Sequence, residues 1–233
     1  MTPFELVEPD SLEAALALLD PADPSVRPAG GCTALMLMMK AGMLKPSRLV
    51  SLRKVEGRYR GVEADAEALC IGATCTLAAI EQSPAVQRAL PTVSRALRTL
   101  ANVRVRNVAT LGGCLAHADP HMDLPPLLIA LGASVVIVGR TGSREIPLAD
   151  LISGYYETTL EGGELIAQAR IPTRLARHCV YRKVTARSAD DWPTLGVAIA
   201  LDVAEGVVRE ARAVLSAAFD RPTRLPALEA LLR

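Results

Sequence analysis

Two glycine pairs are the residues of this chain best suited to hold an anion. They lie in the segments PAGGCT, residues 28–33, and ATLGGC, residues 109–114. Glycine has no Cβ and tolerates positive φ, so backbone N–H groups there can approach a phosphate closely. The first pair leads into a predicted helix, whose N-terminal amides favour negative charge. We expect both segments to cradle a pyrophosphate, although a single Gly-Gly pair is more often a plain turn and neither segment matches GxGxxG or the P-loop.

A cluster of histidine and aspartate follows the second glycine pair, in HADPHMD, residues 117–123. These side-chain types can bind metals. Pro120 argues against a regular helix through the cluster, so shared metal ligation would need a coincidence of spacing. We expect a solvated loop that aims one carboxylate at a ribose hydroxyl.

A third group of polar residues, YRKVTAR, spans residues 181–187 and places Lys183 and Arg187 near the end of a predicted strand. Tyr181 and Lys183 should lie on one face of that strand. Two interpretations stay open: a solvated basic edge, or an ammonium positioned to stabilise a negative charge on a bound cofactor.

The composition excludes several classes of protein. Phe, Trp and Tyr make up 3% of the residues and the net charge is +1, which argues against a nucleic-acid binder. The apolar run 127–138 is too short to span a bilayer and contains Gly132, so it is expected in the core. The first residues, MTPFELVEPD, lack the pattern of a signal peptide, and we expect a cytoplasmic chain.

The five cysteines are scattered and form no CxxC pair. This pattern fits neither a disulfide framework nor a zinc or iron–sulfur site. We therefore predict no metal site in this chain and expect any metal centre to belong to a partner.

The elements that must position these groups can be read from hydrophobic periodicity and turn residues. Ser11 should cap a first helix, and a strand, the Gly30-Gly31 turn, a helix ending at Gly42 and a strand at 48–52 predict a βαβ unit. Thr76 should cap another helix. Residues 104–126 are rich in turn formers and are predicted to be too irregular for a helix.

The rest of the chain alternates between helical and strand patterns. Further elements are expected at residues 91–100, 125–131, 133–138, 146–151, 164–171, 179–186 and 194–218. Residues 133–138 are continuously apolar, as in a buried strand, and Glu205-Gly206 is typical of a hairpin turn. The predicted fold class is α+β.

Four segments together resemble the FAD-binding medium subunit of the xanthine dehydrogenase and carbon monoxide dehydrogenase family, the molybdenum hydroxylases. They are PAGGCTALMLMMKAG, VRNVATLGGCLAHADPHMDLPP, ISGYYETTLEGGELI and YRKVTARSADDWP. The resemblance implies a two-subdomain FAD-binding fold: a small N-terminal α/β subdomain at 1–57, a larger α+β subdomain at 58–172, and a C-terminal α+β domain at 173–233. This last domain is shorter than is usual in the family.

The resemblance also implies FAD as the cofactor, with its pyrophosphate between the two glycine segments. Asp123 would lie at the ribose or adenine side, and Lys183 near the isoalloxazine, where it would stabilise the negative charge of the reduced flavin. The implied FAD-binding residues are Pro28, Ala29, Gly30, Gly31, Cys32, Thr33, Ala34, Ala109, Thr110, Leu111, Gly112, Gly113, Cys114, Ala118, Asp119, Asp123, Tyr181 and Lys183.

The implied function is electron transfer within a larger complex. A large molybdopterin subunit would hydroxylate the substrate, and a small 2Fe-2S subunit would deliver electrons to the FAD of this chain. The flavin would pass them to an acceptor such as a quinone, NAD or dioxygen. No catalytic acid or base is then required of this chain.

Two alternatives remain from the sequence. One is a self-contained FAD-dependent reductase, similar to the distantly related cell-wall nucleotide-sugar reductases. The other is a flavin-free scaffold subunit, because Cys32 and Cys114 stand where the family more often has polar residues. A thiol is a weaker hydrogen-bond donor than an amide, and a redox-sensitive site is conceivable there.

Overall fold

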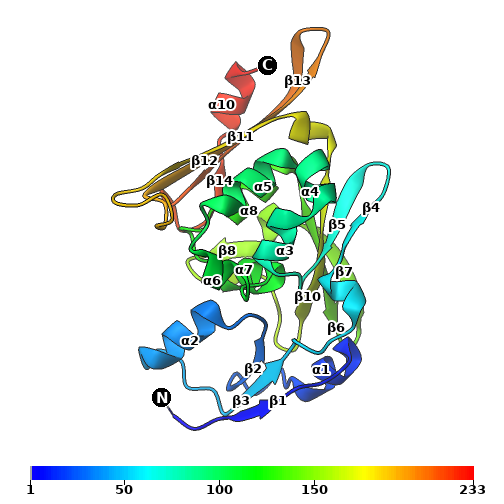
Figure 1. The fold of residues 1–233 in the computed structure, drawn as a ribbon, viewed down its shortest axis with the longest axis vertical. Coiled ribbons are helices and arrows are strands. Elements are labelled where there is room, and N and C mark those ends of the chain that lie inside the picture. Colours follow the sequence, from blue (N-terminus) through cyan, green and yellow to red (C-terminus); the bar gives the residue numbers. More distant parts are fainter. Residues whose placement is uncertain (1) are drawn as a thin grey trace.

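A small parallel sheet forms the N-terminal part of the computed structural model, which describes residues 2–233 (Figure 1). Its strands have the order β1-β3-β2, and β2 pairs in parallel with β3 across the intervening helix α2, which confirms the βαβ unit. Ser11 accepts a hydrogen bond from the Ala14 amide at the start of α1, as predicted. The elements are β1 (Glu5–Val7), α1 (Leu12–Leu18), β2 (Val26–Ala29), α2 (Thr33–Lys40) and β3 (Arg48–Ser51).

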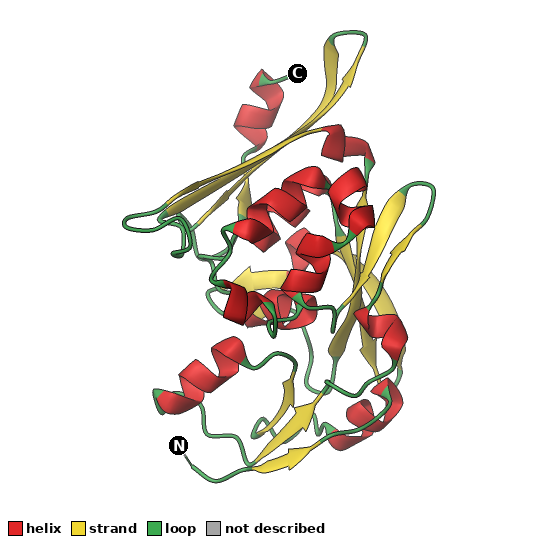
Figure 2. Ribbon diagram, in the orientation of Figure 1, coloured by secondary structure: helices red, strands yellow, loops and turns green. Residues whose placement is uncertain are grey.

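A five-stranded antiparallel sheet of order β4-β5-β10-β6-β7 organises the middle of the chain, and a group of short helices packs on it (Figure 2). Its strands are β4 (Val62–Ala64), β5 (Ala68–Gly72), β6 (Ser134–Gly139), β7 (Gly142–Pro147) and β10 (Leu165–Pro172). The helices are α3 (Leu77–Gln82), α4 (Pro84–Ala89), α5 (Pro91–Arg98), α6 (Val103–Arg106), α7 (Leu111–His117), α8 (Leu124–Leu131) and α9 (Leu148–Leu151). A 3-10 turn (Gly57–Arg60) precedes this sheet, and the two-stranded pair β8 (Ile152–Gly154) and β9 (Glu157–Thr158) follows α9.

Both faces of strand β6 are covered, which explains its continuous apolar sequence. Val135 and Ile137 belong to the main core with the helices, whereas Val136 and Val138 pack with α1 on the opposite face. Arg140 stabilises this contact, because its guanidinium donates to the carbonyl of Leu16, near the end of α1, at 3.1 Å. The prediction of a buried strand is therefore confirmed.

The prediction that residues 104–126 are too irregular for a helix is wrong for most of that segment. Helix α6 overlaps the start of the segment, and helix α7 lies within it. Gly112 and Gly113 belong to the first turn of α7 rather than to a loop. Thr110 caps α7 by accepting a hydrogen bond from the Gly113 amide. This cap and the bonds from the Leu111 and Gly112 amides to carbonyls between β5 and α3 offset the low helix propensity of the glycines.

A four-stranded antiparallel sheet of order β11-β12-β13-β14 ends the chain, followed by one short helix. The Glu205-Gly206 hairpin is confirmed, and both residues have positive φ. Ala198, Ala200 and Val214 join the same core as α8, so the inner face of this sheet packs on the central helices. The elements are β11 (His178–Val184), β12 (Leu195–Ala204), β13 (Val207–Ser216), β14 (Thr223–Arg224) and α10 (Pro226–Leu231), after the 3-10 turn Arg174–Arg177.

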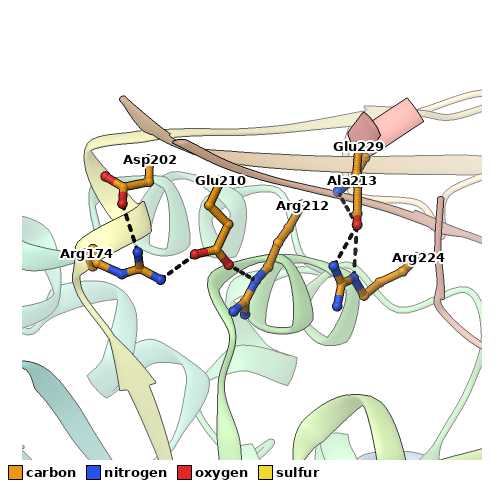
Figure 3. Close-up of polar contacts among 7 residues, drawn as sticks. All are labelled: Arg174, Asp202, Glu210, Arg212, Ala213, Arg224 and Glu229. Carbon is orange, nitrogen blue, oxygen red and sulfur yellow. Dashed lines mark hydrogen bonds and ion pairs between the residues drawn. The ribbon is translucent and has the colours of Figure 1, made fainter. Parts of the chain in front are cut away.

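Ion pairs link this sheet to the 3-10 turn before it and to α10 after it (Figure 3). Glu210 of β13 accepts from both Arg174 and Arg212, the second at 2.8 Å. Glu229 of α10 is almost fully buried and pairs with Arg224 at 2.6 Å.

No helix within residues 2–233 is long and apolar enough to cross a membrane.

Candidate functional site

The two glycine segments lie against each other in the structure. A Cβ added to Gly31 would stand 1.8 Å from the carbonyl oxygen of Val108, and a Cβ on Gly30 would stand 2.7 Å from Oγ1 of Thr110. Distances this short leave no room for a side chain. Both glycines of the first pair are therefore required for contact between β2–α2 and the start of α7.

The N-terminus of α2 has no side-chain cap. Cys32 occupies the cap position in the left-handed conformation, with φ 58° and ψ 8°, and its side chain makes no capping bond. The first backbone bond that closes the helix runs from the Met36 amide to the Cys32 carbonyl at 2.9 Å. The amides of Thr33 and Ala34 thus have no partner within the helix, and they are available to an anion.

The N-terminus of α7 differs, because protein groups already accept from its amides. The Leu111 amide donates to the Cys75 carbonyl at 3.0 Å, and the Gly112 amide donates to the Ala73 carbonyl at 2.8 Å. The Gly113 amide is held by the Thr110 hydroxyl oxygen at 3.2 Å. This segment therefore has fewer free backbone donors than the glycine pattern predicted.

Thr110 and Gly113 nevertheless face open space. A Cβ on Gly113 would meet only Oγ1 of Thr110, at 3.0 Å, whereas a Cβ on Gly112 would meet Ala73 at 2.7 Å. A cavity of about 90 Å³ lies here and is lined by residues of both glycine segments. Its lining is Pro28, Gly30, Leu52, Ala73, Thr74, Thr110, Gly112, Gly113, Ala116, Leu160, Glu164, Leu165 and Ile166.

The one carboxylate that lines this cavity is already paired. Glu164 accepts two hydrogen bonds from the guanidinium of Arg144, at 3.0 and 2.8 Å. The bonds from Arg144 hold the pKa of the Glu164 carboxyl below its usual value. Its negative charge is thus compensated within the protein, which reduces its repulsion of a bound phosphate.

The expectation of a solvated loop at residues 117–123 is wrong. Ala118 ends α7 in the left-handed conformation, and the side chains that follow turn inward. Asp119 is 1% exposed and Asp123 is 3% exposed. The Asp119 carboxylate accepts from the amide of His121 at 2.9 Å.

Asp123, Tyr181 and Lys183 form one buried polar group. The Tyr181 hydroxyl donates to Oδ1 of Asp123 at 2.7 Å, and Lys183 Nζ donates to Oδ2 at 3.1 Å. Lys183 also donates to the Thr99 carbonyl at 2.8 Å. Burial raises the pKa of the Asp123 carboxyl, while the bonds from Tyr181 and Lys183 oppose that rise.

Tyr181 and Lys183 do share one face of β11, as predicted. The interpretation of Lys183 as a solvated strand-edge residue is wrong, because its side chain is 7% exposed and ion-paired. Arg187 lies beyond the strand and is exposed. The sequence placed these residues near a strand end but gave no sign that Asp123 is their partner.

The thiols beside the glycines are not activated. Burial raises the pKa of Cys114 to about 12, and its sulfur lies 3.2 Å from the sulfur of Met122. Burial also raises the pKa of Cys32. Both thiols are protonated at neutral pH, so neither has the thiolate character that reactive cysteines need.

The predicted site residues fall into two groups, one around the glycine pairs and one around Asp123. The first offers free α2 amides and the Thr110 hydroxyl, which are donors suited to a diphosphate, and this donor set fits FAD. In the second, the Tyr181 phenol and the Lys183 ammonium already donate to Asp123. Sequence reasoning missed eight lining residues of the cavity at the glycine segments, which come from several segments: Leu52, Ala73, Thr74, Ala116, Leu160, Glu164, Leu165 and Ile166. Residues 2–233 hold no group of three or more His, Cys, Asp or Glu side chains that could bind a metal ion.

Comparison with known proteins shows the family of this chain. Residues 2–174 match the family model described as the FAD binding domain in molybdopterin dehydrogenase. The chain is 31% identical to the carbon monoxide dehydrogenase medium chain of Hydrogenophaga pseudoflava, over 91% of this chain and 74% of that protein. It is 29% identical to the glyceraldehyde dehydrogenase medium chain of Sulfolobus acidocaldarius, over 97% and 79% respectively.

Solved structures show the same likeness. A chain of the reconstituted CO dehydrogenase from Oligotropha carboxidovorans superimposes with a TM-score of 0.94 at 30% identity, over 99% of this chain and 80% of that one. The α+β fold predicted from the sequence is confirmed, as is FAD as the cofactor. The chain belongs to the FAD-binding subunits of the molybdenum hydroxylase family.

Proposed function

We propose that this chain takes electrons from iron–sulfur clusters of a partner subunit onto its FAD and passes them to an external acceptor. The observation that supports its cofactor part is the uncapped N-terminus of α2, since Gly30 just before that helix lies against Thr110, the cap residue of α7. Bound FAD supplies the redox chemistry there, since it exchanges electrons singly and in pairs.

The chain's own residues have two tasks in this proposal. The amides of Thr33 and Ala34 and the hydroxyl of Thr110 hold the pyrophosphate, and the missing side chain at Gly113 lets it approach. Backbone amides carry most of this binding, so the protonated thiols of Cys32 and Cys114 are not needed as ligands.

In the same proposal Asp123, Tyr181 and Lys183 lie together at one part of the cofactor, because Lys183 Nζ is 3.1 Å from Oδ2 of Asp123. The ammonium of Lys183 favours negative charge nearby, but its ion pair with Asp123 already compensates part of that charge. We therefore expect a smaller effect of Lys183 on the flavin potential than a free ammonium at the same place would have.

The partners follow from the names of relatives. Several are called medium chains or medium subunits of dehydrogenases and hydroxylases, including the nicotine 6-hydroxylase medium subunit of Paenarthrobacter nicotinovorans. We infer that this chain assembles with a large molybdopterin subunit and a small 2Fe-2S subunit, and that substrate is hydroxylated in the large one.

Flavin content tests the binding part of the proposal. The purified chain, supplied with FAD and passed through a desalting column, should retain close to one FAD per chain. Colourless protein that remains folded by circular dichroism and takes up no FAD would favour the scaffold alternative. Substrate-dependent reduction of the flavin by the isolated chain would favour a self-contained reductase.

The electron-transfer part needs the complex. Rapid mixing of substrate with the assembled complex should reduce the flavin, and removal of the 2Fe-2S subunit should abolish that reduction. Flavin reduction that persists without the 2Fe-2S subunit would contradict the proposed route.

A further inference from the structure

Residues 159–164 connect β9 to β10 and form part of the wall of the cavity at the glycine segments. Leu160 and Glu164 of this connection line the cavity. The connection also packs against the N-terminal part of the chain, since a Cβ on Gly162 would stand 2.8 Å from the carbonyl oxygen of Pro21. The cavity is small, about 90 Å³, so a phosphate group bound in it would lie close to the Glu164 side chain.

One guanidinium binds both ends of the 159–164 connection. Arg144 lies on β7, and its Nε and Nη2 atoms donate to the two carboxylate oxygens of Glu164 at 3.0 and 2.8 Å. Nη2 also donates to the carbonyl of Thr159 at 2.9 Å. Two parallel bonds to a carboxylate are the geometry for which a guanidinium is best suited. Together these bonds fix the guanidinium and the carboxylate in one arrangement.

The other donor to the Glu164 carboxylate also comes from the connection. Its Oε2 accepts from the Glu161 amide at 2.8 Å. The Glu164 side chain is 16% exposed, so water screens its charge only in part. The carboxylate is therefore held at the cavity by protein groups, and it keeps its negative charge there.

The charge balance of the cavity depends on Arg144. Within residues 2–233, the lining holds no lysine, arginine or histidine, and Arg144 is the one ion-pair partner of Glu164. A half-buried carboxylate without that partner would repel a diphosphate strongly, because little solvent separates the two charges. Arg144 does not itself line the cavity, so its effect on a ligand passes through Glu164.

We propose that Arg144 is a positioning residue of the FAD site, which holds the Glu164 carboxylate in place and compensates its charge so that a diphosphate can bind beside it. The inference rests on the proposed binding of the FAD pyrophosphate at the glycine segments. It adds a residue from outside the cavity to the groups that determine FAD affinity.

Isothermal titration of the flavin-depleted chain with FAD tests the inference in the parent, R144Q, E164Q and R144Q/E164Q. R144Q should lose at least about tenfold in FAD affinity, because Glu164 then has an uncompensated charge. E164Q should bind FAD more tightly than the parent, since the guanidinium charge is no longer compensated and attracts the phosphates. The double variant should return to about the affinity of the parent, because neither charge remains.

This pattern differs from that of a merely structural ion pair. All three variants lack the same ion pair, so a pair needed only for folding would weaken FAD binding in all of them. R144K keeps the positive charge and should restore most of the affinity lost in R144Q.

Arg170→Gln is the matched control. Arg170 lies on β10 of the same sheet, pairs with Asp65 at 3.1 Å, and has a side chain that is 35% exposed, against 38% for Arg144. It lies outside the lining of the cavity, and its variant should bind FAD as the parent does.

Parental FAD affinity in R144Q, parental or weaker affinity in E164Q, or no recovery in the double variant would overturn the inference while FAD binding by the chain stands. An equal loss in R170Q would also overturn it. A parent that binds no FAD would contradict the cofactor part of the proposed function, and this inference with it. Circular dichroism checks that each variant is folded; should R144Q not fold, the affinity of E164Q relative to the parent decides by the same rule.

Discussion

The two glycine pairs have the same sequence pattern but opposite structural roles. Gly30 and Gly31 lie before a helix whose amides have no protein partner, whereas Gly112 and Gly113 lie inside a helix whose first amides are already bonded. Beside the first pair, backbone donors stay free for an anion. Beside the second, the absent side chain of Gly113 leaves space next to the hydroxyl of Thr110. A glycine pair therefore does not by itself identify an anion site, because anion binding also requires that the neighbouring amides have no protein acceptor.

The glycines also differ in what excludes a side chain. A Cβ at Gly31 would meet backbone of the same protein at 1.8 Å, whereas a Cβ at Gly113 would meet only the Thr110 hydroxyl, at 3.0 Å. The first glycine should matter for folding and the second for the ligand. Four substitutions test that division, beginning with the largest expected effect.

Gly31→Val should destabilise the fold itself. The new side chain would collide with the Val108 carbonyl, and the contact between β2–α2 and α7 would have to open. We expect a loss of at least about 3 kcal/mol in the free energy of unfolding, measured by denaturant titration. Gly57→Val is the control, because no atom lies within 4 Å of a Cβ there. Equal stability of the Gly31 variant and the parent would contradict the packing role.

Gly113→Val should abolish FAD retention while the protein stays folded. Its Cβ meets little within the protein but occupies the space through which a phosphate approaches. We expect FAD per chain to fall at least tenfold, on the order of 1.4 kcal/mol or more, with unchanged circular dichroism. The same Gly57→Val control should retain its flavin. Parental flavin content in the Gly113 variant would remove this segment from the FAD site.

Thr110→Val should have a moderate effect on both stability and binding. Loss of the cap on the Gly113 amide should cost about 1 kcal/mol of stability. FAD affinity should also fall, because a hydroxyl donor is removed. Thr110→Ser keeps the hydroxyl and should restore both quantities; failure of serine to restore FAD affinity would show that the threonine hydroxyl is not a ligand.

Cys32→Gly should produce the smallest change, a gain in stability. The left-handed conformation at residue 32 strains any residue with a Cβ, by about 1–2 kcal/mol. Glycine removes that strain but loses more chain entropy on folding, so the net gain should be roughly 0.5–1 kcal/mol. FAD content should not change, because the thiol is protonated and donates toward the Gly30 carbonyl at 3.7 Å. A fall in FAD content would show that the thiol takes part in binding.

Local signals predicted much of the fold correctly. The caps at Ser11 and Thr76, the βαβ unit, the Glu205-Gly206 hairpin and the buried strand β6 all depend on neighbouring residues or on short-range periodicity. Helix α7 was missed for the opposite reason. Its glycines oppose a helix locally, and the carbonyls of Ala73 and Cys75, remote in sequence, stabilise it.

The α+β class could be predicted from patterns of adjacent residues, and the membership of the family from the resemblance of four segments. Two features needed the folded chain: which amides remain free, and the pairing of Asp123 with Lys183 across 60 positions. Hydrogen bonding and burial depend on which distant segments pack together, and no local pattern specifies those contacts.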